Sequence, residues 1–125
     1  IGLFLSPASV KYFEKMFAEN KKFDVIILDP PAFAKNKKSI FAAKSKYSKI
    51  NKMAMKLLNE NGYLVSSSCS YHINENEFYH LITNEAIKLG LKLILIHKGN
   101  QALDHPILTS MEETNYLKFF IFKIL

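Results

Sequence analysis

The segment from Phe23 to Leu28 constrains the fold of this chain more than any other. It is almost continuously apolar, includes three β-branched residues, and is stopped abruptly by Asp29-Pro30-Pro31. A short apolar run of this kind is typical of a strand buried on both faces, as in a parallel sheet. Because parallel strands must be joined by crossover connections, the segment predicts an α/β fold.

Helical patterns alternate with such strand patterns along the chain. A first helix should start at Ser6-Pro7, because serine caps helices and proline is tolerated in their first turn. A second should end at Gly62, and a third should run from a capping box at Asn74 to Gly90. The expected apolar faces are Val10, Phe13, Met16 and Phe17 in the first helix, Tyr47, Ile50, Ala54, Leu57 and Leu58 in the second, and Phe78, Leu81, Ile82, Ala86 and Leu89 in the third.

Three further strands are predicted between and after these helices, over residues 63–69, 91–97 and 116–125. Strands separated by helices imply parallel crossover units. The last strand follows a loop instead of a helix, so we expect it to pair antiparallel, at or near the sheet edge.

Length and composition bound the class of protein. A chain of 125 residues, 49% of them hydrophobic, is expected to form one folded domain. Its apolar runs are much shorter than the ~20 residues that cross a bilayer, so no membrane span is expected. The single cysteine excludes a disulfide framework and favours a reducing, cytoplasmic setting, and the four histidines show no metal-ligand spacing.

The net charge of +6 comes from lysine alone, since the sequence has no arginine. An excess of lysine favours approach to polyanions, although a solvated lysine-rich surface would give the same balance. We interpret residues 35–49 as a basic loop that leads into the second helix. Its lysines are candidate phosphate contacts: Lys35, Lys37, Lys38, Lys44, Lys46 and Lys49.

Two predicted strand ends carry groups capable of chemistry. At the first, Asp29 is followed by two prolines, which lack amide donors and leave carbonyls free to accept from a substrate. At the next, Cys69 lies among serines instead of valine or isoleucine. A right-handed crossover would bring both ends to one rim of the sheet, where α/β proteins bind ligands. A simple turn at Asp29 and a buried structural thiol at Cys69 are the alternatives.

These residues resemble the class I S-adenosylmethionine (SAM)-dependent methyltransferases. The resemblance rests on residues 23–33, the lysine-rich loop, the helix after it, and Ser-Ser-Cys-Ser at 67–70. The group that makes 5-methylcytosine in large-subunit ribosomal RNA is most similar, and residues 104–106 and 116–118 also resemble its C-terminal segments. The resemblance implies the C-terminal half of a Rossmann-like methyltransferase sheet, mostly parallel with an antiparallel last strand and flanked by helices.

The resemblance also implies a covalent mechanism. Cys69 would attack C6 of a cytosine as a thiolate and make C5 nucleophilic enough to take a methyl group. Asp29 would hydrogen-bond or protonate the ring at N3. Asp29, Pro30 and Pro31 would line the SAM side of the pocket, while Phe33 would stack on the base or pack under the loop. The target base must be unpaired or flipped out to reach such a site.

The sequence departs from that family in places. The Gly-rich turn and the acidic residues that hold SAM are absent, and Glu112 stands where a proline is common. We therefore expect residues 1–125 to be one partial domain, the latter half of a catalytic domain, with an unpaired sheet edge and no activity by itself. Ribosomal RNA and the missing N-terminal half are the expected partners, and a homodimer of the parent is left open.

Two other interpretations fit parts of the sequence. Methyltransferases that act on adenine N6 or guanine N7 share the Asp-Pro-Pro motif but need no cysteine, and Ala32 separates the motif here from the aromatic Phe33. A truncated, non-enzymatic RNA-binding remnant would also account for the basic charge and for the missing cofactor half.

Overall fold

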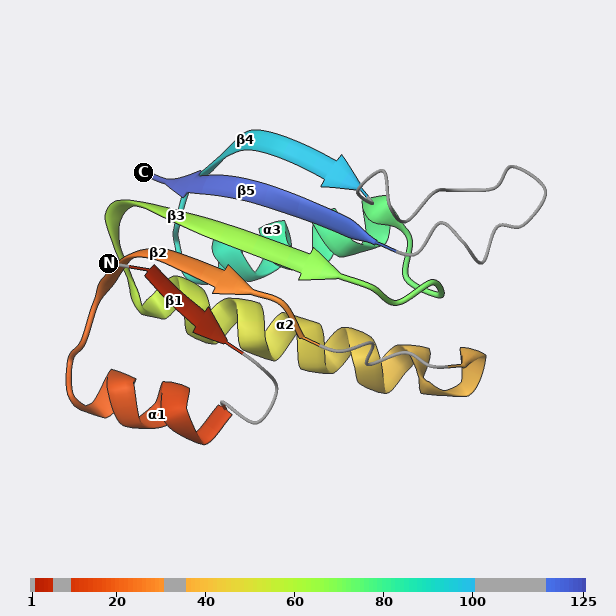
Figure 1. The fold of residues 1–125 in the computed structure, drawn as a ribbon, viewed down its shortest axis with the longest axis horizontal. Helices are drawn as coiled ribbons and strands as arrows, with labels where there is room; N and C mark the ends of the chain where they lie inside the picture. Colours follow the sequence, from red (N-terminus) through yellow and green to blue (C-terminus); the bar gives the residue numbers. More distant parts are fainter. Residues whose placement is uncertain (1, 6–9, 31–35, 101–116) are drawn as a thin grey trace.

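The computed structural model describes residues 2–5, 10–30, 36–100 and 117–125, and these form a sheet flanked by helices (Figure 1). The strands are β1 (Gly2–Leu5), β2 (Phe23–Leu28), β3 (Leu58–Ser68), β4 (Leu93–Asn100) and β5 (Lys118–Ile124). The helices are α1 (Val10–Ala18), the 3-10 helix η2 (Lys37–Ser39), α2 (Ile40–Lys56) and α3 (Glu75–Lys88).

The strands lie in the order β1-β2-β3-β5-β4. β1, β2 and β3 are mutually parallel, and β5 runs antiparallel to both β3 and β4. The predicted α/β fold with an antiparallel last strand is confirmed, but the expected mostly parallel sheet is mixed, with two parallel and two antiparallel pairings among the described strands. β5 lies one strand in from the edge, because it is inserted between β3 and β4.

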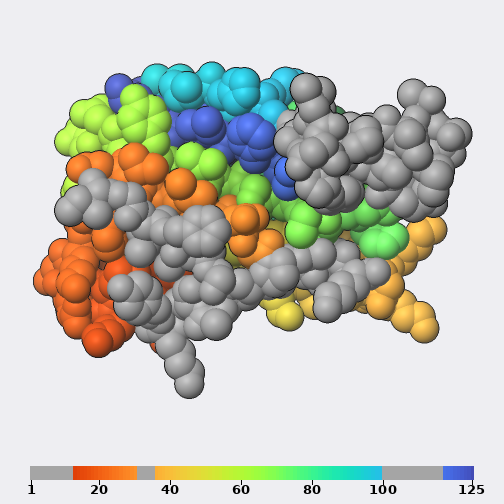
Figure 2. Space-filling view, viewed as in Figure 1, coloured from red at the N-terminus to blue at the C-terminus, as the bar shows by residue number. Residues whose placement is uncertain are grey.

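The core lies on the face of the sheet that α2 and α3 cover (Figure 1). Ile26 and Leu28 of β2 and Phe122 of β5 point into it and are fully buried. The prediction that β2 is buried on both faces is wrong, since Ile27 is 37% exposed on the opposite face. Atoms of β2, β3, β4 and β5 form the surface there, as Figure 2 shows, because no described helix covers these strands on that side.

The first helix can be compared with its prediction only in part, because the expected start at Ser6-Pro7 lies outside the described residues. Phe13 and Met16 are buried as expected, but Phe17 is exposed and lies under the Lys56 ammonium. The second helix differs from its predicted extent. α2 begins at Ile40, so most of the predicted basic loop is helical. Its alanines and lysines are good helix formers, and this favours the longer helix.

Gly62 was predicted to end the second helix, but it is a residue of β3. α2 ends at Lys56, and β3 starts two residues later at Leu58. A Cβ atom at Gly62 would lie 2.8 Å from the carbonyl oxygen of Asn59 and 3.1 Å from that of Asp24. Glycine is therefore needed where these backbone segments approach each other closely.

α3 begins and ends as predicted. The Asn74 side chain accepts a 2.8 Å hydrogen bond from the Glu77 amide, and the Glu77 carboxylate accepts one from the Asn74 amide, which completes the capping box. Gly90 follows the helix with φ of +72°. None of the described helices is long and apolar enough to span a membrane.

Candidate active site at the strand ends

The carboxyl ends of β2 and β3 lie at the same rim of the sheet. The strands are parallel, and Leu28 at the end of β2 pairs with Ser66 of β3. Asp29 and Pro30 directly follow β2, and Cys69 directly follows β3. The structure therefore brings Asp29, Pro30 and Cys69 together, whereas Pro31 lies outside the described residues.

Ser67 connects the two strand ends, and the sequence did not single it out for this. Its hydroxyl donates a 2.8 Å hydrogen bond to the carbonyl oxygen of Leu28 and lies 3.3 Å from the Asp29 carboxylate. The Asp29 side chain is exposed, so it can accept from a ligand while Ser67 limits its position. Ser67 directly follows Ser66, the residue that pairs with the last residue of β2, and this position could have suggested the contact.

Cys69 is a half-buried free thiol, and its Sγ lies 3.9 Å from the carbonyl oxygen of Pro30. Burial, and then the negative charge of Asp29, raise the pKa of the thiol above its ordinary value. A backbone hydrogen bond and the charge of Lys118 oppose this increase in the pKa. At neutral pH the resting group is thus a thiol, and it must lose a proton before it can act as a nucleophile.

The serines that surround Cys69 belong to a buried hydrogen-bond network beneath it. The Ser66 hydroxyl donates to the Asn51 side chain at 2.6 Å, and the Asn51 amide donates to the carbonyl of Tyr47 at 2.8 Å. The Tyr47 hydroxyl is 2.7 Å from that of Ser70. Within the described part of the chain, no buried side-chain N or O atom lacks a hydrogen-bond partner. Ser66 and Ser70 can replace apolar residues here because α2 offers their hydroxyls polar partners.

Lys118, the first residue of β5, reaches the same rim. β5 is antiparallel to β3, and Lys118 pairs with Ser68. Its side chain is buried, and its ammonium donates a 2.7 Å hydrogen bond to the carbonyl of Ser70. Burial lowers the pKa of Lys118 to about 8, against the opposing effects of Cys69, Glu77 and Glu75. No role in the site was predicted for Lys118 from the sequence.

The predicted RNA-contacting residues are only partly described. Lys37 and Lys38 are exposed in η2, which is capped by Asn36, whereas Phe33 and Lys35 lie outside the described residues, as does the segment 101–116 with its Asp-His-Pro sequence. Lys44 forms an ion pair with Glu77 of α3. This lysine therefore connects two helices and is less available to a phosphate.

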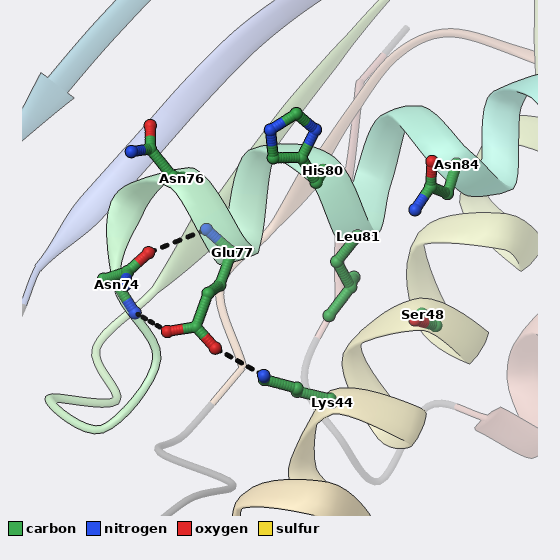
Figure 3. Close-up of a pocket in the computed structure, with 8 residues that line it drawn as sticks. All are labelled: Lys44, Ser48, Asn74, Asn76, Glu77, His80, Leu81 and Asn84. Carbon is green, nitrogen blue, oxygen red and sulfur yellow. Dashed lines mark hydrogen bonds and ion pairs between the residues drawn. The ribbon is translucent and has the colours of Figure 1, made fainter.

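A shallow groove of about 430 Å³ lies between α2 and the start of α3 (Figure 3). In Figure 3 the Glu77 carboxylate points toward the Lys44 ammonium across this groove. Its lining comprises Lys44, Ser48, Asn74, Asn76, Glu77, His80, Leu81 and Asn84, and thus includes neither Asp29 nor Cys69. A cluster of three or more metal-binding side chains is not found among the residues whose placement the structure describes.

Comparison with known proteins finds no matching family model, but it finds individual relatives. Over 105 residues, 84% of this chain, the sequence is 39% identical to ribosomal RNA large subunit methyltransferase I of Escherichia coli O1:K1, and equally so to its namesake in Shigella boydii serotype 18. The chain spans about a quarter of the length of these relatives, 26% of each.

Solved structures agree with this result. A protein described as a methyltransferase, solved in complex with SAH, matches 90% of this chain with a TM-score of 0.75 and 27% identity. A second protein, described as a SAM-dependent methyltransferase from Streptococcus mutans, matches 90% of this chain with a TM-score of 0.74 and 26% identity. The chain covers 29% and 28% of these two proteins. It is thus similar in fold and sequence to part of a SAM-dependent methyltransferase, and in sequence to part of one named for ribosomal RNA.

Proposed function

We propose that this chain carries the catalytic strand ends of a SAM-dependent methyltransferase that forms 5-methylcytosine in 23S ribosomal RNA. Its similarity to ribosomal RNA large subunit methyltransferase I supports the reaction class and the substrate class. The observation that carries the proposal is the Cys69 thiol beside the Asp29 carboxylate, at adjoining strand ends linked by Ser67. A nucleophile and a hydrogen-bonding carboxyl group are what covalent methylation of a pyrimidine requires.

In the proposed reaction, Cys69 loses its proton and its sulfur forms a bond to C6 of the cytosine. Electrons of the C5–C6 double bond shift through the ring to N3, which takes up a proton from the Asp29 carboxyl group, and C5 becomes nucleophilic. When bound, SAM would supply the methyl group that C5 takes up, with S-adenosylhomocysteine as the leaving group, and the N3 proton would return to Asp29. Loss of the C5 proton to a base, with breakage of the S–C6 bond, would then restore the aromatic ring and release Cys69 as a thiolate.

We also propose that the chain is the latter half of a catalytic domain and holds only one side of the cofactor. Asp29, Pro30 and Pro31 would form that side, and the exposed Asp29 carboxylate is able to accept a hydrogen bond there. The fit is partial, because the sequence contains no Gly-rich turn of the kind that lets a backbone approach a dinucleotide-like cofactor. We expect no methyl transfer from labelled SAM to unmodified ribosomal RNA by the 125-residue chain alone, and clear turnover would contradict this.

The proposed RNA contacts are Phe33, Lys35, Lys37 and Lys38, close in sequence to Asp29. The stretch from 30 to 59 contains eight lysines and no acidic residue, so the excess positive charge of the chain is concentrated there. Such charge would bind the phosphates on either side of the target base and position the base without reading its identity.

An RNA that contains 5-fluorocytidine tests the proposal directly, because fluorine at C5 blocks the final elimination and leaves the protein attached to the base. We expect the full-length protein to form this adduct in the presence of SAM and Cys69→Ala to form none. Ser45→Ala, an exposed serine of α2, is the matched control and should form the adduct normally. An adduct that survives Cys69→Ala would remove Cys69 from the mechanism.

The lysine-rich stretch also favours a second candidate, an RNA-binding protein without catalysis. This second candidate predicts that the full-length protein binds RNA but neither forms the adduct nor transfers a methyl group. Methylation of a purine, with Cys69→Ala fully active, would instead assign the protein to the adenine or guanine methyltransferases.

A further inference from the structure

Lys118 is the least expected polar residue of the core. Its side chain is 7% exposed, and lysine is almost never buried so completely unless its ammonium is paired. It shares the helix-covered face of β5 with Phe120 and Phe122, in a strand whose residues alternate between buried and half-buried. An apolar residue would fit that pattern at lower cost, so the charge calls for an explanation.

The ammonium of Lys118 is directed at the turn that carries Cys69. It donates to the carbonyl of Ser70, the residue that follows Cys69, at 2.7 Å. From the other side the Ser70 hydroxyl contacts the Tyr47 hydroxyl, also at 2.7 Å, and the Ser70 amide donates to Ser68 at 3.3 Å. The backbone just after the thiol is thus held by groups from β5, α2 and β3.

The charges around the thiol oppose one another. Asp29, at the end of β2, disfavours a thiolate at Cys69, whereas Lys118, at the start of β5, favours it. Two acids of α3 also act on Lys118, but each has a lysine of its own: Glu77 pairs with Lys44, and Glu75 lies 3.9 Å from Lys98. Among the described residues, Lys118 is the one cationic side chain that lowers the pKa of Cys69.

We propose that Lys118 is a positioning residue that holds the turn bearing Cys69 and supplies the positive charge that stabilises the Cys69 thiolate. When the thiol gives up its proton to solvent, the sulfur becomes negatively charged. The Lys118 ammonium attracts this charge, whereas the Asp29 carboxylate repels it. The pKa of Lys118, about 8, keeps the ammonium charged at neutral pH and lets it become neutral in mild alkali. The use of this thiolate in methyl transfer rests on the proposed function, but its stabilisation does not.

Alkylation of Cys69 by iodoacetamide tests this inference, because Cys69 is the only cysteine of the chain and every adduct reports on it. The rate would be measured at pH 7, where Lys118 is charged, and at pH 10, where it is neutral. We expect Lys118→Met to lower the rate at pH 7 severalfold, because loss of the ammonium reduces the thiolate fraction, and to leave the rate at pH 10 nearly unchanged. A purely structural role would change both rates equally.

Three further variants complete the test. Lys118→Gln keeps a donor for the Ser70 carbonyl without the charge, and it should lose the same rate at pH 7 even if Lys118→Met fails to fold. Lys118→Arg should restore that rate, and Lys123→Met, on the opposite face of β5, should leave it unchanged. If Cys69 in Lys118→Gln were alkylated at pH 7 at the wild-type rate, the inference would be overturned. Methyl transfer is not measured here, so failure of the proposed function would not change these rates.

Discussion

Ser67 limits where the Asp29 carboxylate lies, through one hydroxyl that contacts both Leu28 and Asp29. We predict that Ser67→Ala lowers the free energy of unfolding by about 1 kcal/mol, because a partly buried carbonyl loses its donor. Urea unfolding would measure the loss, with Ser45→Ala as the exposed control. The adduct with 5-fluorocytidine RNA should also form more slowly in Ser67→Ala. Equal stability of the two variants would mean that Ser67 does not constrain the site.

Lys118 makes stability depend on pH. In the folded chain its pKa is about 8, whereas in the unfolded chain it returns to about 10.5. Between these values the unfolded chain binds more protons, so stability rises with pH, and below pH 8 the full cost of burial applies. That cost is about 3 kcal/mol at ~1.4 kcal/mol per pKa unit.

We therefore predict that Lys118→Met is more stable than the wild type at pH 7, by about 1 to 2 kcal/mol once the lost hydrogen bond to Ser70 is included. The difference should shrink as the pH rises from 8 to 9. Urea unfolding at pH 7, 8 and 9 would measure it. The raised pKa of Cys69 makes stability fall with pH only above about 9, the upper limit of this pH series, so the comparison is made below that pH. A difference independent of pH would contradict the prediction.

Asp29 and Cys69 could be predicted as neighbours because each follows an apolar strand and parallel strands end at one rim. Ser67 and Lys118 were harder to predict. The period-two pattern of β5 places Lys118 on the face of Phe120, but its partner is the Ser70 carbonyl, whose position depends on how the turn after β3 folds. Contacts of this kind arise from tertiary packing and leave no local pattern.

At the scale of the elements, β3 contains a glycine that approaches neighbouring backbone closely. Gly62→Ala would place a methyl group 2.8 Å from the Asn59 carbonyl, and backbone cannot move aside as a side chain can. We predict a loss of about 1 to 3 kcal/mol in the free energy of unfolding, typical of overpacking. Gly90→Ala provides a contrast, since no atom lies within 4 Å of its Cβ position and only its positive φ resists the change. A cost at Gly62 no larger than at Gly90 would argue against the close approach.

The capping box of α3 offers a second test at this scale. Asn74→Ala removes the acceptor of the Glu77 amide, so we predict a loss of about 1 kcal/mol in the free energy of unfolding. Asn76→Ala, an exposed position two residues later, is the matched control and should change stability little. Thermal unfolding followed by circular dichroism would compare the two variants; equal losses would mean that the cap contributes nothing.

Local signals decided which elements could be predicted. α3 was predicted well, because its capping box and Gly90 act within a few residues of chain. The extent of α2 was not, because we interpreted a run of lysines as a solvated loop, although alanine and lysine favour a helix and α2 also packs against α3 and β3. Gly62 was misinterpreted because a glycine needed for close approach has the same appearance in sequence as one that ends a helix.

At the scale of the molecule, charge is distributed unevenly, with the lysines of residues 30–59 unmatched by any acid in that stretch. We predict that replacing Lys37, Lys38 and Lys49 by glutamine weakens binding to single-stranded RNA and lowers the slope of log affinity against log salt by about 2. A control that replaces Lys21, Lys88 and Lys92 removes the same charge elsewhere. Fluorescence anisotropy over a salt series would measure both. Equal slopes would mean that total charge matters and its placement does not.

The strand order could be predicted only in part. Crossovers through helices fix β2 and β3 as parallel neighbours, and the missing helix before β5 indicates its direction. Its insertion between β3 and β4 depends on which pairing buries Phe120 and Phe122 under the helices, and that is a property of the assembled sheet. One exposed face of the sheet was likewise unforeseen, since an apolar strand pattern does not say what covers each side.

The insertion of β5 also has a consequence for how the protein is made. β4 is synthesised before β5, yet within the described residues it pairs with β5 alone. On the ribosome, β3 and β4 must therefore emerge with open edges and wait for a later strand, and such non-local pairing is slow and exposed to aggregation. The same strand delivers Lys118. A nascent chain thus carries its thiol without the neighbouring cation until β5 has emerged.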